Sequence, residues 1–351
     1  TTTRTVTFSV DDGDVLSDAM RDVRVVSVND APVNALPGPQ RTGQDTPLVF
    51  QSGDGNAITI GDDTSQGHVA VTLTVGDGTI TLTDVVGSEA QANSHFVDDQ
   101  TASAVAMAGD GRSVVVWQSK NQDTGGEGIF AQLYDASGAP TGVEFPVNAT
   151  FADHQTAPAV AMDDDGEFVV VWQSRNQDGD SEGIFAQRFD ASGSAVDPEF
   201  QVNTTFASAQ VAPAIAMDAD GDFVVIWQSA NQDGDGQGIY AQRFDAAGVV
   251  QGDELLVNTE VLGDQVTPAV AMADDGRFVI AWQSADDNGK GIFAQRFDAS
   301  GLRQGPVSQT NLTTASDQIA PSVALADDGS FVLVWQSKDQ DGDGPGIVGH
   351  Y

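Results

Sequence analysis

The stretch FVVIWQSANQDGDGQGIYAQRFDAAG, residues 223–248, decides the fold because close variants of it recur along the chain of 351 residues. Each of the five tryptophans stands in the same WQS triplet, and successive tryptophans are 55, 55, 55 and 53 residues apart. They are Trp117, Trp172, Trp227, Trp282 and Trp335. A fixed period of this length is typical of an architecture in which each repeat is one small structural unit.

One repeat contains four short strand-like segments and no helical period. Read from residue 144, it runs EFPVNAT, APAVAM, the turn DDDG, EFVVVWQS, the loop RNQDGDSEG, IFAQRFD and the turn ASG. The segment FVVVW at 168–172 is apolar without alternation, which indicates burial on both faces. Four-stranded sheets that stack face to face are the blades of a β-propeller. The sequence therefore predicts an all-β protein with a five-bladed β-propeller over residues 88–351.

The two ends of the repeat region suggest how the ring closes. Residues 89–107 align without gaps to residues 144–162, so the first repeat begins at Glu89 on a fourth strand, whereas the last reaches Tyr351 within a third strand. We expect one blade to be shared between both ends and the ring to close at five blades. A piece of a longer array would show the same pattern, so both alternatives stay open.

The first 87 residues have a different character. RTVTFSV and VRVVSV predict the last hairpin of a β module over residues 1–33, and about 33 residues are too few for a core of their own. After a proline-rich joint, the alternating segments PLVF, AITIG, VAVTLTV and TITLT predict part of a second β-sandwich module over residues 34–87.

These segments carry a family resemblance. VTFSVDDGD…VRVVSVNDAPV is similar to the end of the cadherin-like and VCBS-type modules of large bacterial surface and secreted proteins, and PLVFQSGDGNAITIGDD…VAVTLTVGDGTITLTD is similar to the opening half of another such module. The FVVVWQS…QDGDG…AQRFDASG units resemble repeats of the same giant calcium-associated proteins. The resemblance implies an extracellular repeat protein and brings little mechanism with it.

The composition narrows the choice of partners. With 52 acidic and 14 basic residues the formal net charge is −38, so nucleic acid and anionic membrane surfaces are repelled. The chain has no cysteine, so any metal must be held by oxygen or imidazole. No apolar run approaches the roughly 18 residues that span a bilayer, and the first residue is not Met, so a signal peptide would lie outside this sequence.

The loop after WQS predicts a metal site. Acidic or amide side chains two residues apart, followed by glycine, form the first half of a calcium loop, because their oxygens converge on one ion. The fifth and third copies carry this pattern, and the second carries it with Ser181 in place of the glycine. We predict calcium (Ca2+) ligands at Asp339, Asp341, Asp343, Asn231, Asp233, Asp235, Asn176, Asp178 and Asp180. The first and fourth copies keep the pattern only in part.

The alternative is plain turn chemistry, since Asn, Asp and Gly all favour turns without any metal. The connection between blades is expected on the same face as the loop, and its acids would complete a calcium shell. These acids are Asp98, Asp99, Asp153, Asp264 and Asp317.

Other repeated residues receive structural interpretations. The Asp-Gly turns DDDG, DADG and DDGR are interpreted as hairpin turns, and the tryptophans as blade packing in preference to a platform for sugars. Arg188, Arg243 and Arg296 are expected to brace neighbouring carboxylates and not to bind an acidic ligand. The four histidines share no repeat position, and no Ser-His-Asp set or carboxylate pair stands out, so no catalytic residue is assigned.

Three functions remain open. The favoured one is a non-enzymatic, extracellular, calcium-stabilised module that acts in adhesion or matrix attachment and contacts glycans or another surface protein. The second is a propeller lectin with glycan pockets between blades, and the third is a glycan-cleaving propeller enzyme. Fold analogy alone does not choose among them.

Overall fold

The computed structural model describes residues 89–340 and 342–350, together with five strand segments before them. The chain divides into two units, Thr1–Glu89 and Ala90–Tyr351. In the first unit, β1 (Thr2–Asp11), β2 (Leu16–Val26) and β5 (Ala70–Val71) form one antiparallel sheet, and β3 (Val33–Ala35) pairs with β4 (Thr59–Gly61). The predicted cadherin-like modules over 1–33 and 34–87 otherwise lie outside the described residues, so that resemblance stays a prediction.

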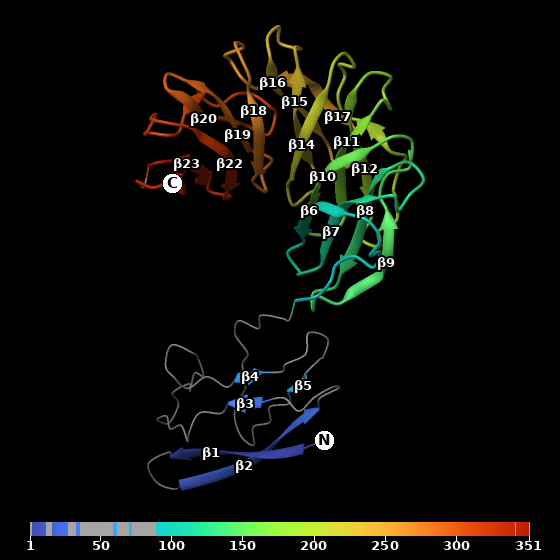
Figure 1. Cartoon of the computed structure of the whole chain (residues 1–351), viewed down its shortest axis with the longest axis vertical. Coiled ribbons are helices and arrows are strands. Elements are labelled where there is room, and N and C mark those ends of the chain that lie inside the picture. The colour runs from blue at the N-terminus through green and yellow to red at the C-terminus, as the bar shows by residue number, and fades with distance from the viewer. Residues whose placement is uncertain are drawn as a thin grey trace. The chain divides into compact units, whose positions relative to one another are not determined.

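The second unit consists of five antiparallel sheets, and each sheet is one blade. Figure 1 shows the five sheets following one another in chain order around an arc. The first blade contains β6 (Gln100–Met107), β7 (Ser113–Lys120), β8 (Glu127–Tyr134) and β9 (Pro140–Pro146); the second β10 (Gln155–Met162), β11 (Phe168–Arg175), β12 (Glu182–Phe189) and β13 (Phe200–Gln201); the third β14 (Gln210–Met217), β15 (Phe223–Ala230), β16 (Gln237–Phe244) and β17 (Val250–Leu256); the fourth β18 (Val266–Met272), β19 (Phe278–Asp286), β20 (Gly289–Phe297) and β21 (Ser308–Gln309); the fifth β22 (Gln318–Leu325), β23 (Phe331–Lys338) and β24 (Pro345–His350). The predicted all-β propeller fold of five blades is confirmed. In the described part of the chain no helix has the length and apolar character needed to cross a bilayer.

The second strand of each middle blade lies between two apolar layers, as its unbroken apolar sequence predicts. Phe168, Val170 and Trp172 of β11 pack on the first blade, whereas Val169 and Val171 pack on the third. Four such clusters join the five blades. Trp172 and Trp227 are fully buried, so the tryptophans are packing residues.

A bulge in the first strand adds a polar link between blades. The pairing of β10 with β11 shifts register between Thr156 and Ala159, and Ala157 within the bulge has a φ of 52°. The amide N–H of Ala157 donates a hydrogen bond of 3.3 Å to the side-chain oxygen of Gln118, the glutamine of the preceding WQS triplet. The link recurs between Ala212 and Gln173 and between Thr267 and Gln228.

The expectation of a shared closing blade is wrong for the described residues. Residues 89–99 form no strand, and the first blade takes its fourth strand from β9. The fifth sheet contains three strands. First strands of successive blades pack side by side, from β6 against β10 to β18 against β22, but no comparable packing between β22 and β6 is described. The first blade forms all four of its strands from consecutive residues. The alignment of residues 89–107 with 144–162 therefore did not require that residues near Glu89 add a strand to the fifth blade.

The strands place the two kinds of connection on opposite faces. The turns between first and second strands meet the ASG-type turns between third and fourth strands, as shown by the approach of Gly221 to Ala246 and of Gly276 to Ala299. We call this the turn face. The loops after WQS and the connections between blades form the other face, which we call the loop face.

Candidate functional site

The predicted calcium loops lie on the loop face, next to the connections between blades. The amide of Asn176 donates to the carboxylate of Asp153 at 3.2 Å, and the carboxylate of Asp264 accepts from the backbone N–H of Gln237 at 3.1 Å. In the first copy, Asn121 donates to Asp98 at 2.9 Å. The loops therefore touch the acids of the connections, which is the arrangement that the sequence pattern anticipates.

The loop carboxylates in the second and third copies are engaged within the protein. Asp178 accepts from the N–H of Asp180 at 3.2 Å, and Asp180 accepts from Ser208 at 3.0 Å. Asp233 accepts from Asn258 at 3.2 Å, and Asp235 reaches the N–H of Gly263 at 3.1 Å. These are turn and bridging contacts.

The loop carboxylates do not gather into one cluster in the described part of the chain. Among residues 89–340 and 342–350, no three acidic or histidine side chains converge as a metal site. Asp341, the centre of the fifth copy between Asp339 and Asp343, lies outside the described residues. Calcium binding therefore stays a prediction, and no step below depends on it.

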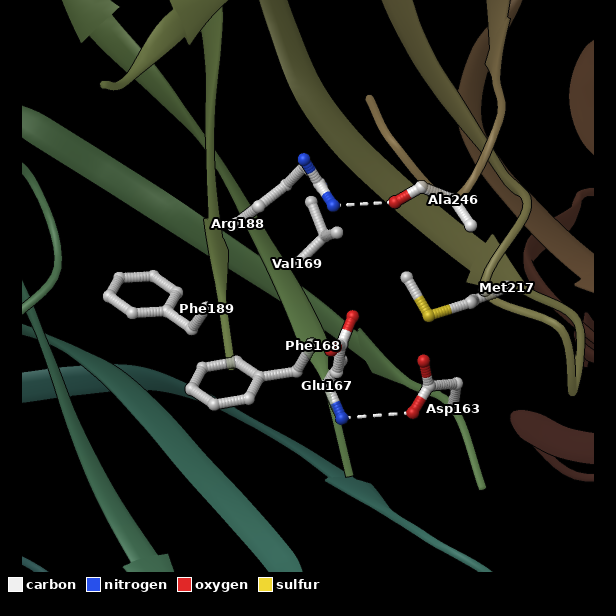
Figure 2. Close-up of a pocket in the computed structure, with 9 residues that line it drawn as sticks. Asp163, Glu167, Phe168, Val169, Arg188, Phe189, Met217 and Ala246 are labelled. Atoms are coloured by element: carbon white, nitrogen blue, oxygen red, sulfur yellow. Dashed lines mark hydrogen bonds between the residues drawn. The ribbon is translucent and has the colours of Figure 1, made fainter. Parts of the chain in front are cut away.

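The turn face carries two equivalent pockets between blades. The first lies between the second and third blades, with Asp163, Glu167, Arg188 and Met217 in its wall, and encloses about 10 Å³. Figure 2 shows that Arg188 extends across it toward Ala246. The guanidinium donates to the carbonyls of Ala246 and Ala247 and pairs with Asp197 at 2.6 Å. Little space is left beside Arg188, and we call this the closed pocket.

The second pocket lies one blade further on and contains more space, so we call it the open pocket. It encloses about 180 Å³ and is lined by Asp218, Asp220, Asp222, Arg243, Asp274 and Asp275, among others. Arg243 occupies the place of Arg188, but its guanidinium donates to the carbonyl of Ser300 at 2.5 Å and has no ion pair with a described carboxylate. Burial lowers the pKa of Arg243, while Asp222 and Asp298 oppose this shift.

Asp274 is the acid that distinguishes the open pocket. The negative charge of Asp327 is the main cause that raises the pKa of Asp274, and desolvation and the charges of Asp164 and Asp220 add to it. Asp327 also accepts a hydrogen bond of 3.2 Å from the backbone N–H of Asp274. Acids from the turns of three other blades thus act on one carboxyl. The closed pocket has Ala219 at the corresponding turn position.

Two other acids of the open pocket have different pKa shifts. Burial raises the pKa of Asp218, and its Oδ1 accepts N–H groups of Asp220 and Asp222, which makes Asp218 a turn residue. Burial would also raise the pKa of Asp275, but hydrogen bonds from the backbone and side chain of Arg277 outweigh it and lower that pKa. Asp274 and Asp275 are therefore adjacent carboxyls whose pKa values are shifted in opposite directions. Such a pair is a mark of acid–base sites.

Sequence reasoning interpreted these Asp-Gly turns as hairpin chemistry, and it missed their convergence. A repeated turn places one residue per blade near the axis, so a signal existed in the second turn position, which holds Asp164, Asp274 and Asp327. Of the arginines expected to brace carboxylates, Arg188 pairs with Asp197, whereas Arg296 is exposed. His154 contacts Glu127 on the loop face, away from this pocket.

Comparisons with known proteins give fold-level neighbours. No family model matches the chain, and no curated protein matches it. An endo-arabinase from Bacteroides thetaiotaomicron is similar at a TM-score of 0.39 and 13% identity, over 68% of this chain and 89% of that one. An alpha-L-arabinofuranosidase from Lactobacillus brevis (TM-score 0.40, 12% identity) covers 72% and 90%, and the GH62 alpha-L-arabinofuranosidase of Coprinopsis cinerea (0.40, 10%) covers 74% and 92%.

The expectation of a non-enzymatic adhesion module is corrected: these neighbours are, by their names, an endo-arabinase and two alpha-L-arabinofuranosidases. At 10–13% identity the likeness concerns the fold and assigns no residue. Residue roles must come from the geometry of this chain.

Proposed function

We propose that the protein cleaves glycans by hydrolysis at the open pocket between its third and fourth blades. The observation that carries the proposal is Asp274, a carboxyl whose pKa is raised by neighbouring acids and which lies at the wall of a cavity of about 180 Å³. Glycoside hydrolysis needs one protonated carboxyl and one carboxylate. A polymeric glycan also fits a place of action outside the cell.

The two roles are assigned as follows. Asp274 donates its proton to the glycosidic oxygen as the C–O bond breaks, so that the leaving sugar departs as a neutral alcohol. Asp220, which lines the same pocket and acts electrostatically on Asp274, takes a proton from the attacking water as its oxygen bonds to the sugar carbon. The two carboxyls then exchange protons with solvent to restore the starting state.

Hydrolysis of a polysaccharide panel tests this proposal. Purified protein is incubated with arabinan, arabinoxylan, xylan and xyloglucan, and released reducing ends are measured. Asp274→Asn should lower kcat by about 10²–10⁴, the contribution of general acid catalysis. Glu167→Gln in the closed pocket is the matched control and should leave kcat unchanged.

A binding measurement distinguishes a glycan-cleaving enzyme from a lectin. If Asp274→Asn still retains the polysaccharide in affinity electrophoresis, the site binds and cleaves. Retention by the unaltered protein without any turnover would instead support the lectin hypothesis. Turnover that survives in Asp274→Asn would reject Asp274 as the acid.

A further inference from the structure

The interfaces between the first four blades are built from the same two halves. The side of a blade that meets the next blade, here its trailing face, carries Val169, Val171 and Ile184 in the second blade. The side that meets the previous blade, its leading face, carries a phenylalanine pair and the tryptophan; in the third blade these are Phe223, Phe244 and Trp227. The two halves bury each other almost completely.

The trailing face of the fifth blade has the same apolar residues, but no layer covers them among the residues that the structure describes. Val332, Val334 and Ile347 occupy the places of Val169, Val171 and Ile184. Ile347 is 77% exposed, whereas Ile184, Ile239 and Ile292 at the same place are 0% exposed. Val332 and Val334 are only half-buried.

A polar link is also unused on this face. Gln173 and Gln228 accept the bulge N–H of the next blade at 3.1 and 2.7 Å. Gln336 is the corresponding glutamine of the fifth blade, and its side chain makes no hydrogen bond to any residue that the structure describes. The face thus offers an apolar surface together with the glutamine acceptor that the first three interfaces between blades use.

The leading face of the first blade does not match the trailing face of the fifth blade. Phe168 stacks on Phe189 with ring centroids 4.9 Å apart, and the third and fourth blades repeat the pair. In the first blade Ser113 and Tyr134 replace the pair, and the Tyr134 hydroxyl donates to the carbonyl of Ala92 at 3.2 Å. A polar outer face of this kind is typical of a terminal, capping repeat. Ring closure or a second copy would therefore bring an incomplete half to the fifth blade.

We propose that the trailing face of the fifth blade docks a further blade of this repeat type, a four-stranded sheet whose leading face carries the phenylalanine pair and the tryptophan. The proposal is independent of the glycan-cleaving function, because the open pocket lies between the third and fourth blades. It rests on continuity with an interface that this chain already forms between its successive blades.

Thiol labelling tests the docking, since the chain has no cysteine. Ile347→Cys is placed in the full chain and in a chain extended after Tyr351 by a copy of residues 189–256, which supplies the fourth strand and one further blade. A second extension, a copy of residues 189–203, supplies the fourth strand alone. Val143→Cys, at a site 82% exposed in the first blade, is the reference thiol.

We expect the longer extension to slow maleimide labelling at Ile347→Cys at least ten-fold, whereas the shorter extension and the reference thiol change less than two-fold. Equal labelling with both extensions would overturn the proposal. So would slow labelling in the unextended chain: at all protein concentrations it would indicate ring closure on the first blade, and at high concentration alone it would indicate a second copy.

Discussion

Asp274 and Asp275 are neighbours in one turn, yet they are opposite kinds of carboxyl. Asp275 accepts hydrogen bonds from the backbone and side chain of Arg277, at 2.5 Å for the side-chain contact, and they favour its ionised form and lower its pKa. The negative charges of Asp327, Asp164 and Asp220 disfavour the ionised form of Asp274 and raise its pKa. At the scale of single residues, the chemistry is set by which neighbours the repeat brings to each oxygen.

The pH profile of hydrolysis should report this environment. Asn at position 327 removes the main charge that raises the pKa of Asp274, so that pKa falls in Asp327→Asn. Because the acid is active only when protonated, the basic limb of kcat/KM against pH should move to lower pH. Asp328→Asn, in the same turn, should leave the limb in place, since Asp328 is not among the groups that shift Asp274.

A carboxyl 13C titration of Asp274 by NMR checks the same shift without turnover. Superimposable profiles for the unaltered protein and Asp327→Asn would show that another group controls the rate.

Burial of the tryptophans makes a second prediction at this scale. Trp227 is 0% exposed between the second and third blades, so Trp227→Ala should lower the free energy of unfolding by about 3–5 kcal/mol. Val249→Ala, at a side chain 57% exposed, should change it by less than about 0.5 kcal/mol. Urea unfolding measures both. A Trp227→Ala protein of unchanged stability would reopen the sugar-platform interpretation.

At the scale of elements, the repeat pattern predicts the three inner strands of each blade well. FVVVW is buried on both sides because the flanking blades pack on it. The unbroken run of apolar residues predicts this burial. The fourth strand varies, from two residues in β13 to seven in β9 and β17, because it lies at the outer edge and few contacts fix its length.

The open pocket could not be predicted in the same way. Arg188 and Arg243 stand in the same AQRF motif, but only Arg188 both donates to a carbonyl of the next blade, that of Ala246, and pairs with an aspartate, Asp197. Whether the arginine closes its pocket depends on side chains of the following turn and strand. That information lies outside the motif.

The glutamine links between blades give a prediction at the element scale. Gln173→Leu removes the acceptor for the N–H of Ala212 and a 2.9 Å hydrogen bond to Thr156, and it should lower the free energy of unfolding by about 1–2 kcal/mol. Gln336→Leu is the matched control with no such link, and we expect a change below about 0.5 kcal/mol. Urea unfolding decides between them. An equal loss in both variants would show that the fifth blade already has a partner.

At the scale of the whole molecule, the net charge of −38 determines how cations affect the stability of the folded state. Mutual repulsion among carboxylates destabilises the compact state, and any salt reduces it by screening. The loop carboxylates lessen this cost by accepting backbone N–H groups, as Asp178 and Asp235 do. A stabilising effect of calcium therefore has two possible origins, general screening and specific coordination, which a comparison of salts separates.

The calcium prediction is tested by thermal melts of the full chain in 1 mM calcium chloride, in chelator, and in sodium chloride of matched ionic strength. An extracellular site with a dissociation constant of about 10⁻⁴–10⁻³ M would add about 0.4–1.4 kcal/mol at that concentration. If the loops coordinate calcium, calcium should raise Tm by more than sodium chloride of the same ionic strength does. The double variant Asp341→Ala, Asp343→Ala should lose the part of this increase that comes from the loop of the fifth repeat. Asp110→Ala, in a turn on the other face, should keep the whole increase. Equal shifts in calcium and sodium would assign the acids to turn chemistry and screening, because screening depends on ionic strength whereas coordination depends on the ion.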